Sequence, residues 1–526
     1  MTNETSPAAS KLTGFRVAAA ILLLLLFNAA LHQPFQQPVE KDAATYYYLG
    51  QEIGKGRVLY RDAWDHKTPL TPFVASLVYL LHSRFRSVDY ITATRFVFIS
   101  ILYATSLVIF LLVKEWTGDR WAAFTASLIL AGLNDLMWFA AQGPIPKILM
   151  NFTGLLSLWL FQKNRTGAAG FFTGLAFLDW QPGIVFALPF VLHLIHGRKS
   201  LNIPKAVITY MAGFLAPVTA FIIYFRLEGA LGDLSQAVYF FNTLRVNVLL
   251  DPLRNLRDIH RKLVWLKDSH LFFLGAAAFL AYPFMKAFNR FIKETPGTLK
   301  KIDLLFLLTL GTTAYSLINF NSVDDTIPFT VLAAIWTGVF SGLLSRPVPR
   351  KRKEIYHLLV IAVLLSYTLR HTWNHSLVRF VTEGETRENR LVNIRKKVVF
   401  NREYQEKYFR RFMDKDSRIL SVGPVEFLLP GEFSNPLTFF TIYENVGGYI
   451  RKYYPGGWEK LLKAIKTADP DIIVIIPWDD RKSLKRFTAF LKENNYYLKG
   501  WQFKKWVIMV DKKFVYAKAP PKTDKL

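Results

Sequence analysis

The chain has 526 residues, of which 52% are hydrophobic and 15% are aromatic. This length and apolar content exclude a single soluble domain of ordinary size and indicate a polytopic membrane protein with a second unit attached. The sequence contains no cysteine, so disulfides, thiolate metal sites and cysteine nucleophiles are excluded.

The formal net charge of +27 is spread along the chain. Residues 1–370 contain 36 Lys+Arg against 21 Asp+Glu, and the remainder contains 30 against 18. In the first portion we attribute the excess to the positive charge of cytoplasmic loops, and in the second to a face held near anionic headgroups. A nucleic-acid partner would need the charge concentrated on one face of a soluble domain, so we expect no such partner.

The first apolar run covers 13–31, with Arg16 near its start. A cleaved signal peptide is the alternative, because small residues follow Asn28, but we favour a retained anchor since many spans follow. About eleven spans are expected in all; the others fall near 91–113, 120–140, 144–161, 167–178, 182–196, 204–226, 270–288, 303–320, 327–344 and 355–370.

Alternate loops differ in charge in the way that the positive-inside rule requires. With a cytoplasmic N-terminus, the inner loops carry Lys and Arg, whereas the short outer loops near 141, 180 and 322 carry none and include Asp179, Asp324 and Asp325. This orientation predicts that residues 32–90, 227–269 and everything after 370 lie on the outer face of the membrane. We expect an integral membrane protein, of a bacterial plasma membrane in the first instance, with an archaeal membrane or the endoplasmic reticulum as the alternatives.

From about residue 371 the pattern becomes that of a water-soluble domain. Helices are expected over 387–411, 458–467 and 481–492, and strands over 418–422, 471–477 and 506–510. This alternation predicts a small extracytoplasmic α/β domain over 371–526, with a disordered tail from Ala519, beside a membrane domain over 1–370.

The stretch 40–72 is a charged and aromatic segment directly after the first span. Residues 40–53 have helical spacing, Gly54 and Gly56 end that helix, and a further helix over 70–82 is too short to span and should lie along the interface. Between the helices lies a polar cluster composed of Arg61, Asp62, Asp65, His66 and Lys67.

This stretch resembles the first outer loop of the GT-C superfamily of glycosyltransferases, specifically the group of protein O-mannosyltransferases and aminoarabinose transferases. The resemblance is carried by Asp42, Tyr46, Gly56, Tyr60, Asp62, His66, Lys67, Pro69 and Leu70. Members often have Asp-Glu where this chain has Asp42-Ala43, and Glu-Lys-Pro-Pro where it has His66-Lys67-Thr68-Pro69. These departures leave the sugar and the use of a metal open.

The resemblance implies an α-helical polytopic GT-C-like protein that transfers a sugar, with inversion, from a polyprenyl-phosphate donor to a lipid, glycan or protein acceptor at the outer face. A carboxylate can take the acceptor's proton, and Asp42 is our candidate for this base. Cations stabilise a phosphate leaving group, and we expect Lys67 in this role with Arg61 and His66 as helpers. Substrate-binding or metal-organising candidates are Glu40, Tyr46, Tyr60, Asp62 and Asp65; orienting the cations, binding sugar hydroxyls and holding a divalent cation stay open as their roles.

The outer loop 227–269 is unusually cationic and is a second candidate for phosphate binding, with a helix lying on anionic membrane lipids as the alternative. Its basic residues include Arg245, Arg254, Arg257, His260, Arg261 and Lys262. Weaker candidates for the same cavity are Gln142, Lys147, Asp179 and Gln181.

Two other functions compete with the enzyme. A transporter or flippase of a polyprenyl-linked glycan would place ionisable residues near the middle of several spans, whereas here they cluster in outer loops. A receptor or assembly factor built around the C-terminal domain would not depend on Asp42.

Overall fold

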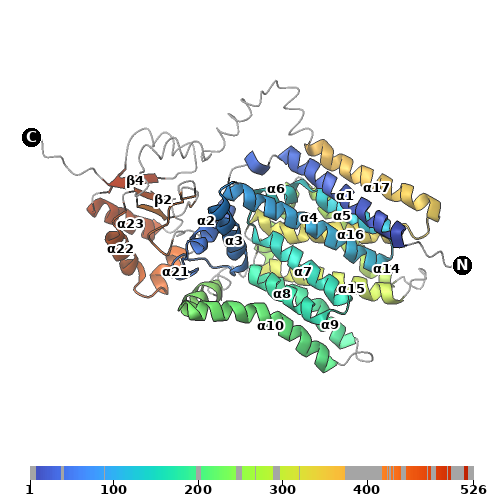
Figure 1. Cartoon of the computed structure of the whole chain (residues 1–526), viewed down its shortest axis with the longest axis horizontal. Helices are drawn as coiled ribbons and strands as arrows, with labels where there is room; N and C mark the ends of the chain where they lie inside the picture. The colour runs from blue at the N-terminus through green and yellow to red at the C-terminus, as the bar shows by residue number, and fades with distance from the viewer. Residues whose placement is uncertain are drawn as a thin grey trace, which may run out of the picture.

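The computed structural model describes residues 7–32, 34–36, 39, 41–87, 89–196, 203–243, 252–266, 268–287, 296–318, 320, 322–372, 418–422, 425, 428–429, 432–439, 446–470, 472–475, 481–494, 496–498 and 514–518. Figure 1 shows a bundle of helices with a smaller unit of strands and helices at one end, next to α2 and α3. Glu40, Arg245, the helix expected over 387–411, the strand expected over 506–510 and the tail from Ala519 lie outside the described residues.

The first helices follow the order that the sequence predicts. They are α1 (Pro7–His32), the short η1 (Pro34–Gln36), α2 (Lys41–Gly54) and α3 (Leu70–Phe85). The chain turns after α2 because Gly56 has a φ of 87°, which favours glycine. The two predicted helices that flank the polar loop are therefore confirmed, each to within a few residues.

The bundle continues with helices of very different lengths. They are α4 (Tyr90–Thr117), α5 (Arg120–Gly132), α6 (Asn134–Gln142), α7 (Pro146–Gln162), α8 (Thr166–Asp179), η2 (Gln181–Ala187), α9 (Leu188–His196), α10 (Ile203–Leu227), α11 (Leu231–Leu234), η3 (Ser235–Phe240), α13 (Pro252–Trp265), α14 (Ser269–Ala287), α15 (Pro296–Ile318), η4 (Val323–Thr326), α16 (Ile327–Leu344) and α17 (Arg350–Thr372).

Four helical segments in the described part of the chain are long and apolar enough to cross a membrane: 90–117, 203–227, 269–287 and 323–344. A fifth forms if α5 and α6, which meet at an angle of 54°, make one broken span. The other expected spans correspond to helices that are shorter or less uniformly apolar, so the count of eleven stays a prediction. The expected boundary at 370 falls inside the last turn of α17.

Small residues let neighbouring helices of the bundle approach closely. A Cβ at Gly170 would lie 2.0 Å from the carbonyl oxygen of Tyr210, and a Cβ at Gly213 would lie 2.0 Å from that of Gly167. In membranes such close backbone contact stabilises helix pairs by dispersion rather than by the hydrophobic effect. The backbones of α8 and α10 are therefore packed closely together.

The C-terminal part contains a four-stranded mixed sheet with the order β1-β2-β4-β3. Its elements are β1 (Ile419–Val422), α21 (Val446–Lys452), α22 (Gly457–Ala468), β2 (Ile472–Ile475), α23 (Arg481–Glu493), β3 (Tyr496–Leu498) and β4 (Phe514–Lys518). β1 and β2 are parallel, while β4 is antiparallel to both β2 and β3. Strands and helices thus alternate as the sequence predicts; that this part is soluble and extracytoplasmic stays a prediction.

Candidate active site

The loop between α2 and α3 is folded back on itself by local hydrogen bonds. Tyr60 has a φ of 71°, which is uncommon for an aromatic residue, and its amide donates to the carbonyl of Ala63 at 2.8 Å. Its buried ring contacts Phe225 at 5.2 Å between centroids, and its hydroxyl donates to the carbonyl of Lys67 at 2.8 Å. This side chain thus supports the backbone that carries Lys67.

Asp62 belongs to the same turn and not to the interior of the site. One carboxylate oxygen accepts from the amide of Val58 at 2.8 Å, and the other accepts from Nε of Arg61 at 3.0 Å. Although burial opposes the effect, the hydrogen bond from Arg61 lowers the pKa of Asp62. Arg61 itself is exposed and also donates to the carbonyl of Glu228 at 2.6 Å, so both residues tie the loop to the end of α10.

Asp42 and Lys67 meet at the rim of the site. Nζ of Lys67 lies 3.9 Å from Oδ2 of Asp42 and 5.2 Å from the centre of the Tyr46 ring. The side chains of Asp42 and Lys67 are 42% and 21% exposed, so both can reach a molecule from outside. An exposed ion pair of this length stabilises a fold by only about 0–1 kcal/mol, and a phosphate can therefore compete for the lysine.

Asp65 and His66 are more deeply buried than Asp42 and Lys67. Oδ1 of Asp65 accepts from the amide of His66 at 2.8 Å, and its Oδ2 has no hydrogen-bond partner among the described residues. Burial raises the pKa of Asp65, and the nearby Lys67 partly offsets this. The His66 ring packs near Trp64 and Phe241. The side-chain amide of Asn242 donates a hydrogen bond of 2.6 Å to the backbone carbonyl of His66.

A second lysine enters the site from the start of α7. The buried Lys147 donates to Asp324 in η4, lies 2.7 Å from Oδ1 of Asp325 and sits 4.8 Å from the centre of the Trp180 ring. Asp179, the last residue of α8, accepts a hydrogen bond from the hydroxyl of Thr71 in α3. From the sequence, Lys147 and Asp179 are weak candidates and Asp324 has no expected role. A buried charge at membrane depth is nevertheless itself a functional signal.

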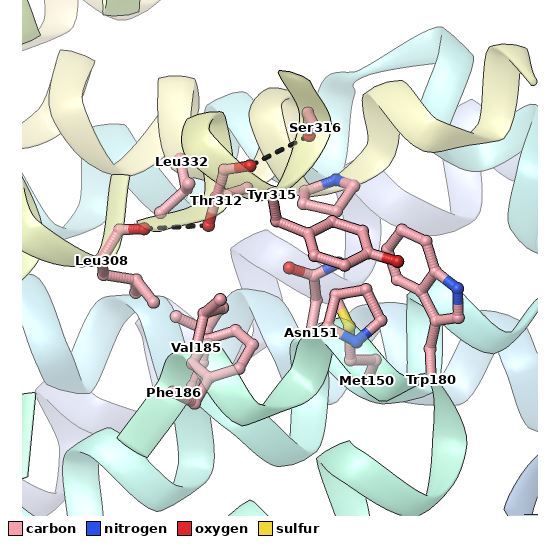
Figure 2. A pocket seen from close by; sticks show the side chains of 13 residues that line it. Met150, Asn151, Trp180, Val185, Phe186, Leu308, Thr312, Tyr315, Ser316 and Leu332 are labelled. Carbon is pink, nitrogen blue, oxygen red and sulfur yellow. Dashed lines mark hydrogen bonds between the residues drawn. The ribbon is translucent and has the colours of Figure 1, made fainter. Parts of the chain in front are cut away.

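An apolar crevice begins beside the second lysine. Figure 2 shows Trp180 and Tyr315 at one end of it, and their ring centroids are 5.8 Å apart. The residues that line it come from α7, the junction of α8 and η2, η2 itself, α15 and α16: Met150, Asn151, Leu155, Trp180, Pro182, Val185, Phe186, Leu308, Thr312, Tyr315, Ser316, Pro328 and Leu332. Trp180 therefore contacts Lys147 and also lines the crevice.

The cationic residues expected from the loop 227–269 lie on the amphipathic helix α13. Arg254 is 67% exposed and pairs with Asp258 at 3.9 Å, and Arg257 is also exposed. Lys262 instead faces inward, 5.0 Å from the centre of the Phe320 ring. Burial lowers the pKa of Lys262, and Asp325 and Asp324 act against that change. Of these three basic residues of α13, Lys262 therefore lies nearest to Asp324 and Asp325.

Part of the C-terminal unit covers the polar loop. The amide of Trp64 donates to the carbonyl of Thr438 at 2.9 Å, and the Thr438 hydroxyl donates to the carbonyl of Arg61 at 2.9 Å. The Trp64 ring also packs on Phe439, with 5.4 Å between centroids. We call residues 432–439 the covering segment. It holds the loop from the side opposite to the helix bundle.

Part of the chain is similar in sequence to known mannosyltransferases. Residues 56–223 match the family of DolP-mannose mannosyltransferases. The dolichol phosphate-mannose mannosyltransferase of Haloferax volcanii is 24% identical over 184 residues, which are 34% of this chain and 38% of that relative. The chain therefore matches well under half the length of this relative.

Two solved structures share the fold across most of the chain. ArnT from Cupriavidus metallidurans, bound to undecaprenyl phosphate, has a TM-score of 0.59 and 12% identity, and the match covers 99% of this chain and 100% of ArnT. The oligosaccharyltransferase of Archaeoglobus fulgidus has a TM-score of 0.50 and 12% identity, with coverage of 90% and 71%. The protein thus shares the fold of these two structures, in agreement with the GT-C resemblance of its first loop. It is similar to ArnT in structure and, over 56–223, to the DolP-mannose mannosyltransferases in sequence.

Proposed function

We propose that this protein is an inverting glycosyltransferase that moves a sugar, most simply a hexose, from a polyprenyl-phosphate donor to an acceptor at the outer face of the membrane. The observation that carries this proposal is the pairing of Asp42 with Lys67 at an open rim, directly above a buried polar site. The positive-inside pattern of the loops supports the outer face.

The donor fits the site in two parts. Its phosphate lies against Lys67 and Lys147, and the first part of its polyprenyl chain enters the crevice beside Trp180. A preorganised ammonium group at a developing phosphate charge lowers the barrier, because it needs no reorganisation during the reaction. The undecaprenyl phosphate bound to ArnT supports this class of ligand.

The residues at the rim then take part in the reaction. The acceptor hydroxyl attacks the anomeric carbon, its proton passes to the carboxylate of Asp42, and the bond between the anomeric carbon and the phosphate oxygen breaks. Polyprenyl phosphate leaves with the additional negative charge, which the lysines stabilise. Asp42 is suited to this role because it is accessible, whereas Asp65 is buried.

A transporter or flippase is the alternative function. It needs charged residues along a path through the spans. In the described part of the chain, the charges nearest the crevice instead gather at helix ends: Lys147 at the start of α7 and Asp324 in η4, just before α16. This placement favours chemistry at one face.

The test is transfer in liposomes by the purified protein, with radiolabelled polyprenyl-phosphate sugars and candidate acceptors. We expect Asp42→Asn to reduce transfer about hundredfold or more, as for the loss of a positioned base, and Lys67→Met also to reduce it. Asp303→Asn, at an exposed pair with Lys286 distant in sequence from the rim, is the matched control and should leave transfer unchanged. Transfer at the parent rate by Asp42→Asn would overturn the assignment of the base. Movement of labelled lipid across the bilayer without consumption of donor would favour the transporter.

A further inference from the structure

Exposed side chains of two kinds follow α13 in separate stripes, because residues three and four positions apart lie on one face of a helix. One stripe is mostly apolar: Leu253, Leu256 and Val264 are 77%, 55% and 48% exposed, and His260, also exposed, lies among them. The other stripe is cationic and consists of the exposed residues Arg254, Arg257 and Arg261. The proposed reaction uses neither stripe.

The order of these stripes around the helix is specific. A third stripe of α13, made of Asn255, Ile259 and Leu263, is buried. Each residue turns the helix by about 100°, so the apolar stripe lies between the buried stripe and the cationic stripe. A helix that lies in a membrane surface has this pattern, with apolar side chains among the acyl chains and cations beside the headgroups.

The buried stripe holds α13 across the ends of other helices. Nδ2 of Asn255 donates to the carbonyl of Leu317, in the last turn of α15, at 2.8 Å. Ile259 and Leu263 belong to an apolar cluster with Phe329, near the start of α16. The segments 269–287 and 323–344, which are long and apolar enough to span, both begin beside α13. The helix therefore lies at the level where spans enter the membrane.

The charge of α13 decides which lipids its exposed side can bind. An anionic lipid surface favours a nearby arginine by about fivefold in binding, so three in one stripe give a strong preference over zwitterionic lipid. Asp258 pairs with Arg254 at 3.9 Å and offsets part of this charge, but three arginines against one aspartate leave a net cationic stripe. Lys262 is turned towards the Phe320 ring and lies apart from this stripe.

We infer that α13 lies in the surface of the membrane and binds anionic phospholipids. Leu253, Leu256 and Val264 enter the outermost part of the acyl-chain region, and the three arginines bind headgroup phosphates. The bound molecules are bulk membrane lipids and not the sugar donor, whose phosphate we assign to Lys67 and Lys147. The inference goes beyond the proposed function and holds equally for a transporter.

The experiment measures which lipids surround α13 in the full chain. Because the chain has no cysteine, Leu253→Cys supplies a single site for a bimane label on the apolar stripe. The labelled protein is placed in phosphatidylcholine nanodiscs that contain an equal fraction of spin-labelled phosphatidylglycerol or spin-labelled phosphatidylcholine. We expect both to quench the label, and the phosphatidylglycerol to quench it about twofold or more strongly.

Salt separates the apolar contact from the charged one without any change in the arginines. Raising NaCl from about 0.1 M to about 1 M shortens the screening length from about 10 Å to about 3 Å. The preference for phosphatidylglycerol should then disappear, while quenching by phosphatidylcholine should stay, because contact of the apolar stripe with acyl chains does not depend on charge.

The decisive variant combines Arg254→Gln, Arg257→Gln and Arg261→Gln in the labelled protein. It should keep the parent's melting temperature, because all three side chains are exposed, and lose the preference at low salt. The matched control combines Lys460→Gln, Lys463→Gln and Lys466→Gln, which removes the same charge from exposed positions of α22 and should keep the preference.

Four outcomes would overturn the inference. Absence of quenching by either lipid would mean that α13 faces water or another protein, and equal quenching by the two lipids would exclude selective binding of anionic lipid. Persistence of the preference in the arginine variant, or its loss in the α22 control, would mean that α13 does not cause it. Loss of the preference on adding undecaprenyl phosphate at a much lower mole fraction would instead indicate a site for the donor phosphate.

Discussion

The hydroxyl of Tyr48 in α2 accepts a hydrogen bond from the amide of Asn435, 387 residues further along the chain, at 2.9 Å. Both residues are buried. The Asn435 side chain also exchanges two hydrogen bonds of 3.1 Å with the backbone of Ser421 in β1. A single asparagine thus connects the sheet of the C-terminal unit to the helix that carries Asp42 and Tyr46.

We expect Asn435→Ala to loosen this connection. The substitution removes both bonds to Ser421 and should destabilise the C-terminal unit by about 2 kcal/mol, since each buried hydrogen bond contributes about 1 kcal/mol. Hydrogen exchange of residues 55–67 should increase, because the covering segment holds that loop. An unchanged exchange rate in the loop, together with a destabilised sheet, would show that the covering segment does not position the site.

Glu52 provides a test of the charges under the covering segment. Its side chain is 0% exposed and lies 2.5 Å from Arg57 and 3.1 Å from Lys55, and it accepts from the Ser434 hydroxyl at 2.8 Å. We expect Glu52→Gln to lower the free energy of unfolding by about 3 kcal/mol, because it leaves Arg57 without its buried partner. The side chain of Glu459, which is 86% exposed, pairs with Arg486, and Glu459→Gln should change the free energy of unfolding by less than about 1 kcal/mol. Equal effects in thermal unfolding would contradict the prediction.

Gly143, between α6 and α7, should not tolerate a side chain. Its φ is 107°, and a Cβ there would lie 2.0 Å from the Tyr47 hydroxyl. We expect Gly143→Ala to destabilise the protein by more than about 1 kcal/mol and to displace the start of α7, which carries Lys147. Adding Tyr47→Phe removes the hydroxyl but leaves the ring carbon Cζ, which would lie 2.6 Å from the new Cβ, and the backbone strain, so the double variant should recover only part of the melting temperature. Complete recovery would contradict the prediction.

Asp65 should show a conflict between stability and activity. Since burial raises the pKa of Asp65 in the folded protein, its ionisation opposes folding. The destabilisation is absent below the unfolded pKa of about 3.9, grows as pH rises and is complete above the folded pKa. Asp65→Asn should therefore raise the melting temperature at pH 7, with a difference that shrinks towards pH 4, and should lower transfer. A pH-independent difference would contradict the role of ionisation.

Local pattern predicted the helices around the first loop and the alternation in the C-terminal unit. Gly56, with a φ of 87°, turns the chain after α2 because glycine adopts this conformation without strain, and such a signal can be read from sequence. β4 (Phe514–Lys518) was missed, since its position beside β2 depends on pairing between distant segments. The strand expected over 506–510 lies outside the described residues.

The site itself was predicted only where one loop contains it. Asp42, Tyr46, Asp65 and Lys67 are neighbours in sequence, and the structure brings them together. Asp179, at the end of α8, and Asp324, in η4 before α16, belong to elements that are distant in sequence, and α8 and α16 both pack against α7, which no local pattern can indicate. The signal that was present, carboxylates in short outer loops between apolar helices, applies to many unrelated positions.

The crevice beside Trp180 has a consequence for the length of the donor. Its lining in α15 extends from Leu308 to Ser316, about two helical turns or roughly 12 Å. In the proposed complex, only the isoprene units next to the phosphate would contact the crevice, and the rest of the polyprenyl chain would lie among the membrane lipids. We therefore expect the protein to accept polyprenyl-phosphate carriers of different total length, provided that the first units have a shape that the crevice can hold.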